Sequence, residues 1–349
     1  MNPSRTELLR WQLAGQFLTS PAPGTAVAAG LCGLQAQYLS NAVYSLYLRS
    51  GSADTAGLVK SWTLRGTLHL FPASDFFLYH PDAPGVEGIF ETPYGRWLYN
   101  GHCAVPRERM LLFARTVAGG LGDAPVSRDA LRDLCRQAGM TRQEEERVFD
   151  GWGGVIRLLS EAGVLCGSPR EARMYLRAPA LPPVRREQAE LELVRRYLLH
   201  YGPATLRDGA YFFRWPQKKL RELFAAAGAK TLAFGGRTYF YLTEPESLPP
   251  LPRCVFLAGF DPLLLGHEKK ESLYLPPAHL RDIFNNTGIV FPALLADGVV
   301  KGKWKEQPRR IEVILFEPLS RPQQQAMLRT AARLWPDKPV VLVQRPFDF

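Results

Sequence analysis

Gln35 and Gln37 place two primary amides at positions i and i+2 of an otherwise apolar stretch, GLQAQY at 33–38. A buried amide costs free energy unless its hydrogen bonds are used. An oriented amide oxygen can hold a water molecule or stabilise a developing positive charge through its dipole, although it has no useful basicity. The alternative interpretation is that both amides tie a loop to neighbouring backbone. The pair is therefore a candidate active site that depends on the elements around it.

Metal and disulfide chemistry find little support in the sequence. The five cysteines are odd in number and widely spaced, without a C-x-x-C pair, so neither a zinc site nor a disulfide framework is indicated. No apolar run reaches the ~18–20 residues of a membrane span. The N-terminus also lacks a charged head followed by a secretory core. We expect a cytoplasmic protein that binds no metal, needs no cofactor and does not enter a membrane.

The formal net charge of +10 points to an acidic partner. Eleven basic residues oppose five acidic ones between Arg185 and Arg237, and a second basic cluster at 301–310 is opposed only by Glu306. Each cluster alone is also compatible with a solvated surface. Two of them on a basic chain favour a polyanion, most often a nucleic acid.

Two stretches show the same order of elements. At 126–180, Ser127 is a predicted N-cap, a longer helix is expected from 144 to 162, and a short hairpin follows. At 185–243, three helices are expected, the last starting near Pro216, and then a hairpin with the Gly235-Gly236 turn. Helices followed by a two-stranded hairpin describe a winged helix.

The remaining chain completes an α+β fold of three tandem winged-helix units followed by a C-terminal β-barrel-like domain. Near the N-terminus we expect helices at about 5–18, 24–48 and 54–62 and then a strand at 67–71. After the proline-rich joint at 248–252, strands are expected around 255–258, 289–291, 294–300, 311–315 and 340–343, with a helix from Pro322 to Trp335. The expected domains are 1–80 (first winged helix, with the glutamine motif), 81–125 (connecting segment), 126–180, 181–247 and 248–349.

Four segments carry a resemblance to a known family: GLQAQY at 33–38, WTLRGTLH at 62–69, FDPLLLGH at 260–267 and LLADGVVKGKW at 294–304. Together they resemble the AlkZ family of bacterial winged-helix DNA glycosylases, which includes the YcaQ-type interstrand-crosslink glycosylases. The segments stand in the family's order across nearly the whole chain. The family's catalytic glutamine–apolar–glutamine motif falls on Gln35, Ala36 and Gln37. Many relatives have an acidic residue and a proline just after the motif, where this chain has Tyr38 and Leu39.

The resemblance implies a bacterial, cytoplasmic, nucleoid-associated monomer that removes N7- or N3-alkylated purines, including bulky adducts and crosslinks, from duplex DNA. Such purines carry a fixed positive charge and a weakened glycosidic bond. Two amides then suffice, because they only have to hold a water beneath the anomeric carbon and stabilise an oxocarbenium-like sugar. No lysine stands beside the motif to form a Schiff base, so a monofunctional mechanism is expected. A bulky lesion also suits an open cleft better than a closed pocket.

Several other residues are candidates for DNA contact. They are Arg65 and His69, which have a structural role as the alternative, Lys218, Lys219 and Arg221 on a predicted third helix, and Arg237 beside the predicted wing turn. For Asp261 we expect a capping or other structural role rather than catalysis. The main competing hypothesis for the whole chain is a non-catalytic winged-helix DNA-binding or regulatory protein. A weaker one is a family member whose chemistry has lapsed.

Overall fold

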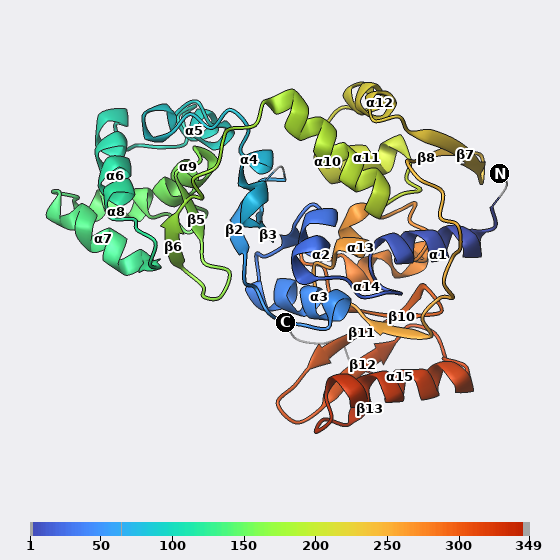
Figure 1. The fold of residues 1–349 in the computed structure, drawn as a ribbon. Helices are drawn as coiled ribbons and strands as arrows, with labels where there is room; N and C mark the ends of the chain where they lie inside the picture. Colours follow the sequence, from blue (N-terminus) through green and yellow to red (C-terminus); the bar gives the residue numbers. More distant parts are fainter. Residues whose placement is uncertain (1–2, 64, 345–349) are drawn as a thin grey trace. The chain divides into compact units, whose positions relative to one another are not determined.

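The computed structural model describes residues 3–63 and 65–344, so Leu64 of the WTLRGTLH segment and the end of the expected C-terminal domain lie outside the described residues. The chain forms two compact units, one made of Met1–Asp54 with Val194–Phe349 and the other of Thr55–Leu193 (Figure 1). These boundaries cut across the expected modules, which stay a prediction. Among the described residues, no helix is long and apolar enough to cross a membrane.

The Thr55–Leu193 unit combines short strands with a helical layer. Its strands are β2 (Leu58–Trp62), β3 (Leu68–Pro72), β4 (Val126–Ser127), β5 (Leu165–Gly167) and β6 (Met174–Arg177), in the order β3-β2-β5-β6-β4 with antiparallel pairs. Its helices are η1 (Ala73–Asp75), α4 (Phe76–Tyr79), η2 (Val86–Gly88), α5 (Pro93–Leu98), α6 (Arg107–Gly119), α7 (Arg128–Gln137), α8 (Arg142–Val148) and α9 (Gly154–Glu161). Phe113, Leu131, Leu158 and Leu159 lie fully buried in a shared core.

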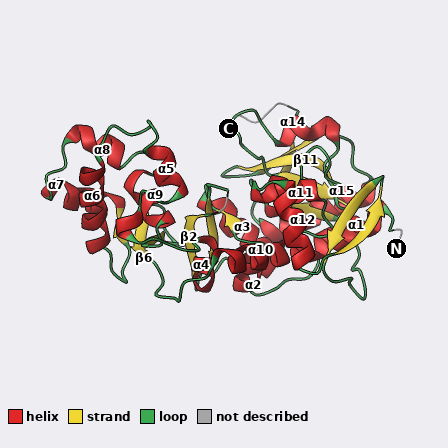
Figure 2. Cartoon of the chain, turned by 90° about the horizontal axis from the view of Figure 1, so that it is seen from above, coloured by secondary structure: helices red, strands yellow, loops and turns green. Residues whose placement is uncertain are grey.

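The other unit begins with α1 (Arg5–Gly15), α2 (Gly24–Gly30), β1 (Leu34–Gln35) and α3 (Leu39–Ser50). The chain re-enters this unit within α10 (Arg186–His200) and continues through α11 (Leu206–Phe213), α12 (Gln217–Ala226), β7 (Lys230–Phe234) and β8 (Arg237–Tyr241). The β7–β8 hairpin packs against α1 (Figure 2). In this contact the ring of Trp11 meets that of Tyr241 edge-on, with centroids 4.9 Å apart. These are the predicted helices and hairpin. That they form a winged helix stays a prediction.

The C-terminal part of this unit is an open sheet. Its elements are β9 (Cys254–Phe256), α13 (Pro262–Gly266), η3 (Pro277–His279), α14 (Leu280–Ile283), β10 (Ala293–Ala296), β11 (Val299–Glu306), β12 (Ile311–Leu315), α15 (Arg321–Leu334) and β13 (Val340–Leu342). The strand order is β13-β12-β11-β10-β9, so the described strands do not close into the barrel expected from the sequence. Alternate residues cover both faces: Leu294 packs in the core that includes Met327 of α15, while Leu295 packs in the core that includes Leu13 of α1.

Four local predictions were wrong, mostly at left-handed residues. The expected helix at 24–48 is interrupted by a turn in which Cys32 and Gly33 have φ of 53° and 84°. The expected helix at 54–62 is instead the strand β2, which follows Gly57 at φ 74°. The helix expected from 144 to 162 is split into α8 and α9 at Gly153 and Gly154, both with positive φ. The strand expected at 289–291 is reduced to a single bridge between Phe284 and Val290.

Candidate active site

A tight turn connects the end of α2 to the glutamine motif. The amide of Gly33 donates to the carbonyl of Ala28 at 2.8 Å, and that of Cys32 donates to Ala29 at 3.1 Å. These two bonds are those of a Schellman helix ending, which requires a left-handed residue at the position of Cys32. The motif therefore begins directly after a helix stop and not inside a helix.

Burial alternates along the four residues that follow. Leu34 and Ala36 are 0% and 2% exposed, whereas Gln35 is partly buried and Gln37 is exposed. In an extended segment, side chains at i and i+2 leave the backbone on the same side. The two apolar residues thus anchor the segment, and both amides are presented on its other side.

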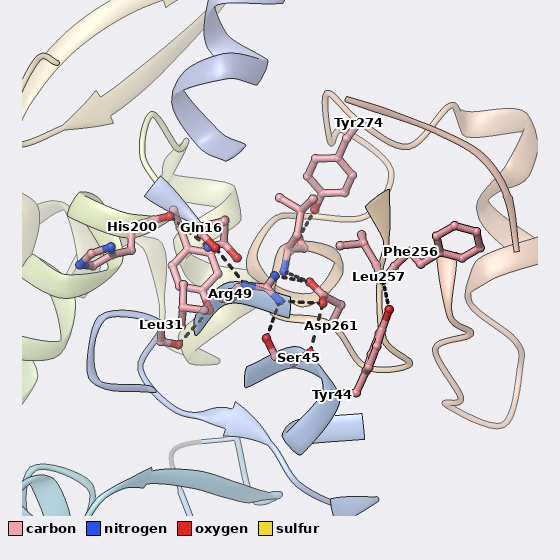
Figure 3. A network of polar contacts seen from close by, with 12 residues as sticks. Gln16, Leu31, Tyr44, Ser45, Arg49, His200, Phe256, Leu257, Asp261 and Tyr274 are labelled. Carbon is pink, nitrogen blue, oxygen red and sulfur yellow. Dashed lines mark hydrogen bonds and ion pairs between the residues drawn. The ribbon is translucent and has the colours of Figure 1, made fainter. Parts of the chain in front are cut away.

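The turn before the motif is fixed by His200, the last residue of α10, and by Tyr201 after it. The hydroxyl of Tyr201 donates to the carbonyl of Leu31 at 2.9 Å. The side-chain amide of Gln16 donates to the carbonyl of His200 at 3.0 Å (Figure 3). A Cβ on Gly30 would stand 2.7 Å from Nε2 of His200, so only glycine permits this approach. These contacts fix the turn that leads into the motif, and none of them involves Gln35 or Gln37.

A buried ion pair fixes the segment after the motif. Arg49, near the end of α3, makes hydrogen bonds of 3.0 and 2.6 Å to the two carboxylate oxygens of Asp261 (Figure 3). The same carboxylate accepts from the hydroxyl of Ser45 at 3.1 Å and from the backbone amide of Leu263 at 3.0 Å, where it caps α13. The capping role expected for Asp261 is confirmed.

The residue that follows Gln37 carries an exposed aromatic ring. Tyr38 is the N-cap residue of α3 and is 49% exposed. Its ring stacks on the buried ring of Phe260, with centroids 5.6 Å apart and an interplanar angle of 27°. Phe260 has φ 56°, and Gly259 before it lies against the Asn41 amide. The FDPLLLGH segment thus supports the position that follows Gln37.

Arg65 and His69 lie in the other compact unit, in and beside the turn between β2 and β3. His69 is 6% exposed, and its Nδ1 lies 2.8 Å from the hydroxyl of Thr63 and 3.0 Å from the carbonyl of Thr67. Burial lowers the pKa of His69 to about 4, so the ring is neutral at physiological pH. Arg65 is partly buried. The observed contacts of His69 hold the turn, and DNA contact by either residue stays a prediction.

The other predicted DNA contacts lie on α12 and β8. Lys218 and Arg221 are exposed, and the ammonium of Lys219 lies 4.5 Å from the ring centroid of Trp215. Arg237 follows the Gly235-Gly236 turn, in which both glycines have positive φ, and its guanidinium is 3.4 Å from the Glu271 carboxylate. Their contact with DNA also stays a prediction. Within the described residues, no group of three His, Cys, Asp or Glu side chains is arranged to hold a metal ion.

Comparison with known proteins defines the class. The family model of AlkZ-like DNA glycosylases matches residues 28–335, so the chain belongs to this family of enzymes acting on N-glycosyl bonds. One relative, an interstrand DNA cross-link repair glycosylase from Streptomyces sahachiroi, is 29% identical in an alignment that covers 96% of this chain and 96% of the relative. The solved structure of Streptomyces sahachiroi DNA glycosylase AlkZ matches with a TM-score of 0.79 and 27% identity, covering 98% of this chain and 100% of that one. The family resemblance seen in the sequence is confirmed.

Proposed function

We propose that this DNA glycosylase hydrolyses the N-glycosidic bond of cationic N7- or N3-alkylpurines in duplex DNA, including bulky adducts and interstrand crosslinks. The observation that carries the proposal is the placement of Gln35 and Gln37 on the solvent-facing side of one anchored segment. The relative named as a cross-link repair glycosylase supports the crosslink part of the proposal.

The chemistry follows from what an amide can and cannot do. In the proposed step a water oxygen attacks C1′ of the sugar while the bond from C1′ to the purine breaks. The bonding electrons neutralise the cationic base, and the water loses its proton to solvent. Amide oxygens orient the water and stabilise the oxocarbenium-like sugar, but they do not deprotonate the water. The lesion must therefore supply the activation through its own charge.

A monofunctional reaction is proposed because residues 24–50, which contain the motif, include no lysine to form a Schiff base. The test is incubation with duplex DNA containing N7-methylguanine, in the presence and absence of a chelator, followed by measurement of free base. We expect release of 7-methylguanine in both conditions and an intact strand with an abasic site. Inhibition by the chelator, or borohydride trapping of a protein–DNA adduct, would contradict this mechanism.

A further inference from the structure

A groove lies between the start of α11 and the β7–β8 hairpin, away from the residues of the glutamine motif in the sequence. It has a volume of about 470 Å³ and is lined by Thr205, Arg207, Arg221, Arg237, Thr238 and Glu271 among others. The three arginines come from three elements: the first turn of α11, the exposed side of α12 and the first residue of β8. Three guanidinium groups and one carboxylate leave this groove with a net charge of +2.

Glu271 bridges two of these arginines. One of its oxygens lies 2.5 Å from Nη1 of Arg207 and the other lies 3.4 Å from Nη1 of Arg237. The Glu271 side chain is 18% exposed, whereas those of Arg207 and Arg237 are 58% and 44% exposed. The carboxylate is thus the inner member of the group, and the guanidinium groups extend around it toward solvent.

The loop that carries Glu271 is itself anchored. The amide of Glu268 donates to Oδ1 of Asp208 at 2.8 Å, and the amide of Glu271 donates to the carbonyl of Glu268 at 3.0 Å. Oδ2 of Asp208 accepts from the amide and hydroxyl of Thr205, which form the capping box of α11. Glu271 is therefore held at the groove by the same residues that begin α11.

We propose that this groove binds a backbone phosphate of duplex DNA and that Glu271 occupies the phosphate's place in the free protein. Guanidinium groups bind carboxylate and phosphate oxygens with the same forked geometry. A carboxylate between two arginines therefore keeps both in an orientation that suits a phosphate, but it also competes with the phosphate for them. The inference rests on the DNA-binding part of the proposed function and is independent of the lesion and of the motif glutamines.

The test is binding to a short undamaged, fluorescently labelled duplex, measured over a series of salt concentrations. Glu271→Gln keeps the size of the side chain and removes its charge, so we expect binding about three- to tenfold tighter than for the unaltered protein. Arg207→Ala and Arg237→Ala should each weaken binding and reduce the salt slope by about one unit. In a protein that carries both arginine substitutions, Glu271→Gln should give no gain, because the competition has been removed.

Matched controls separate this local effect from a general change in charge. Glu246→Gln neutralises an exposed carboxylate that does not line the groove, and Arg329→Ala removes an exposed guanidinium from α15. We expect both to leave affinity within about twofold. Weaker binding by Glu271→Gln, unchanged binding by the arginine variants, or an equal gain from Glu246→Gln would overturn the proposal. Because undamaged DNA is used, failure here is distinguishable from failure to release 7-methylguanine.

Discussion

The guanidinium of Arg49 and the carboxylate of Asp261 form a fully buried ion pair between positions 212 residues apart. Arg49 lies in the last turn of α3, which begins two residues after Gln37, and Asp261 caps α13 in the FDPLLLGH segment. This ion pair therefore joins α3, the helix after the glutamine motif, to α13 through two charges that are buried in the protein interior. Breaking one side of such a pair leaves the other charge buried without its partner.

Asp261→Asn should accordingly reduce the free energy of unfolding by about 3–5 kcal/mol. Thermal or denaturant unfolding measures this loss. The control is Asp297→Asn, which alters an ion pair with Arg253, whose side chain is 68% exposed, and should cost at most about 1 kcal/mol. Equal losses for the two variants would mean that burial of the Arg49–Asp261 pair does not determine its contribution.

His80 gives a prediction on the pH dependence of stability. Its Nε2 lies 2.9 Å from the hydroxyl of Ser61, and burial lowers the pKa of His80 to about 3. Above its ordinary pKa of 6.5 the ring is neutral in both the folded and the unfolded chain, so its titration does not change the free energy of unfolding there. As the pH falls below 6.5, the unfolded chain binds a proton that the folded chain excludes until about pH 3. Stability should fall over this window by up to about 1.4 kcal/mol per pH unit from this group.

His80→Gln removes that titration, so its stability should decline less steeply from pH 6.5 toward pH 4 even if the variant is less stable at neutral pH. Unfolding midpoints measured across this pH range make the comparison. A parallel decline in the unaltered protein and in His80→Gln would contradict the prediction.

Features that are set by neighbouring residues could be predicted from the sequence, whereas those set by contacts between distant segments could not. The Gly235-Gly236 turn and the helix start near Pro216 are local features, and the structure has the predicted hairpin and the predicted helix α12 there. The stretch at 24–48 was predicted as one helix because its alanines and leucines favour helix, whereas the left-handed Cys32 carries no such local signal. The glutamine pair was found from residue type and spacing. Its supports, such as Tyr201, and the pairing of Arg207 with Glu271 depend on contacts between distant segments.

The roles of the amides and the basic residues should separate experimentally. Gln35→Ala or Gln37→Ala should lower the rate of base release by about ten- to a thousandfold, because one preorganised electrostatic contact is lost, while DNA affinity barely changes. Lys218→Ala with Lys219→Ala should do the reverse, weakening binding and lowering the salt slope by about one unit per lost phosphate contact. Single-turnover rates and binding isotherms measure the two effects. Full activity in the glutamine variants would place the active site elsewhere.

Tyr38 should contribute to holding the substrate. One face of its ring is stacked on Phe260 and the side chain is 49% exposed beside Gln37, so the ring is available to a base or sugar. Stacking of a base on an aromatic side chain is worth about 1–3 kcal/mol. Tyr38→Ala should therefore raise KM for lesion-containing duplex by about five- to a hundredfold, and Tyr38→Phe should restore it. Tyr47→Ala, at another exposed tyrosine of α3, is the control and should have little effect.

Substrate scope follows from the absence of a base in the glutamine motif. Since an amide cannot deprotonate water, the rate should depend on the charge of the leaving group. Cationic N7- or N3-alkylpurines should be excised, and neutral lesions such as uracil or 8-oxoguanine should not. Enlarging the N7 substituent should cost little, because the side chains of Gln37 and Tyr38 are exposed. Single-turnover excision of uracil, N7-methylguanine and a bulky N7 adduct in one sequence context tests both points. Efficient removal of uracil would reveal a stronger base near the motif, and a large loss of rate on the bulky adduct would reveal a closed pocket and contradict crosslink repair.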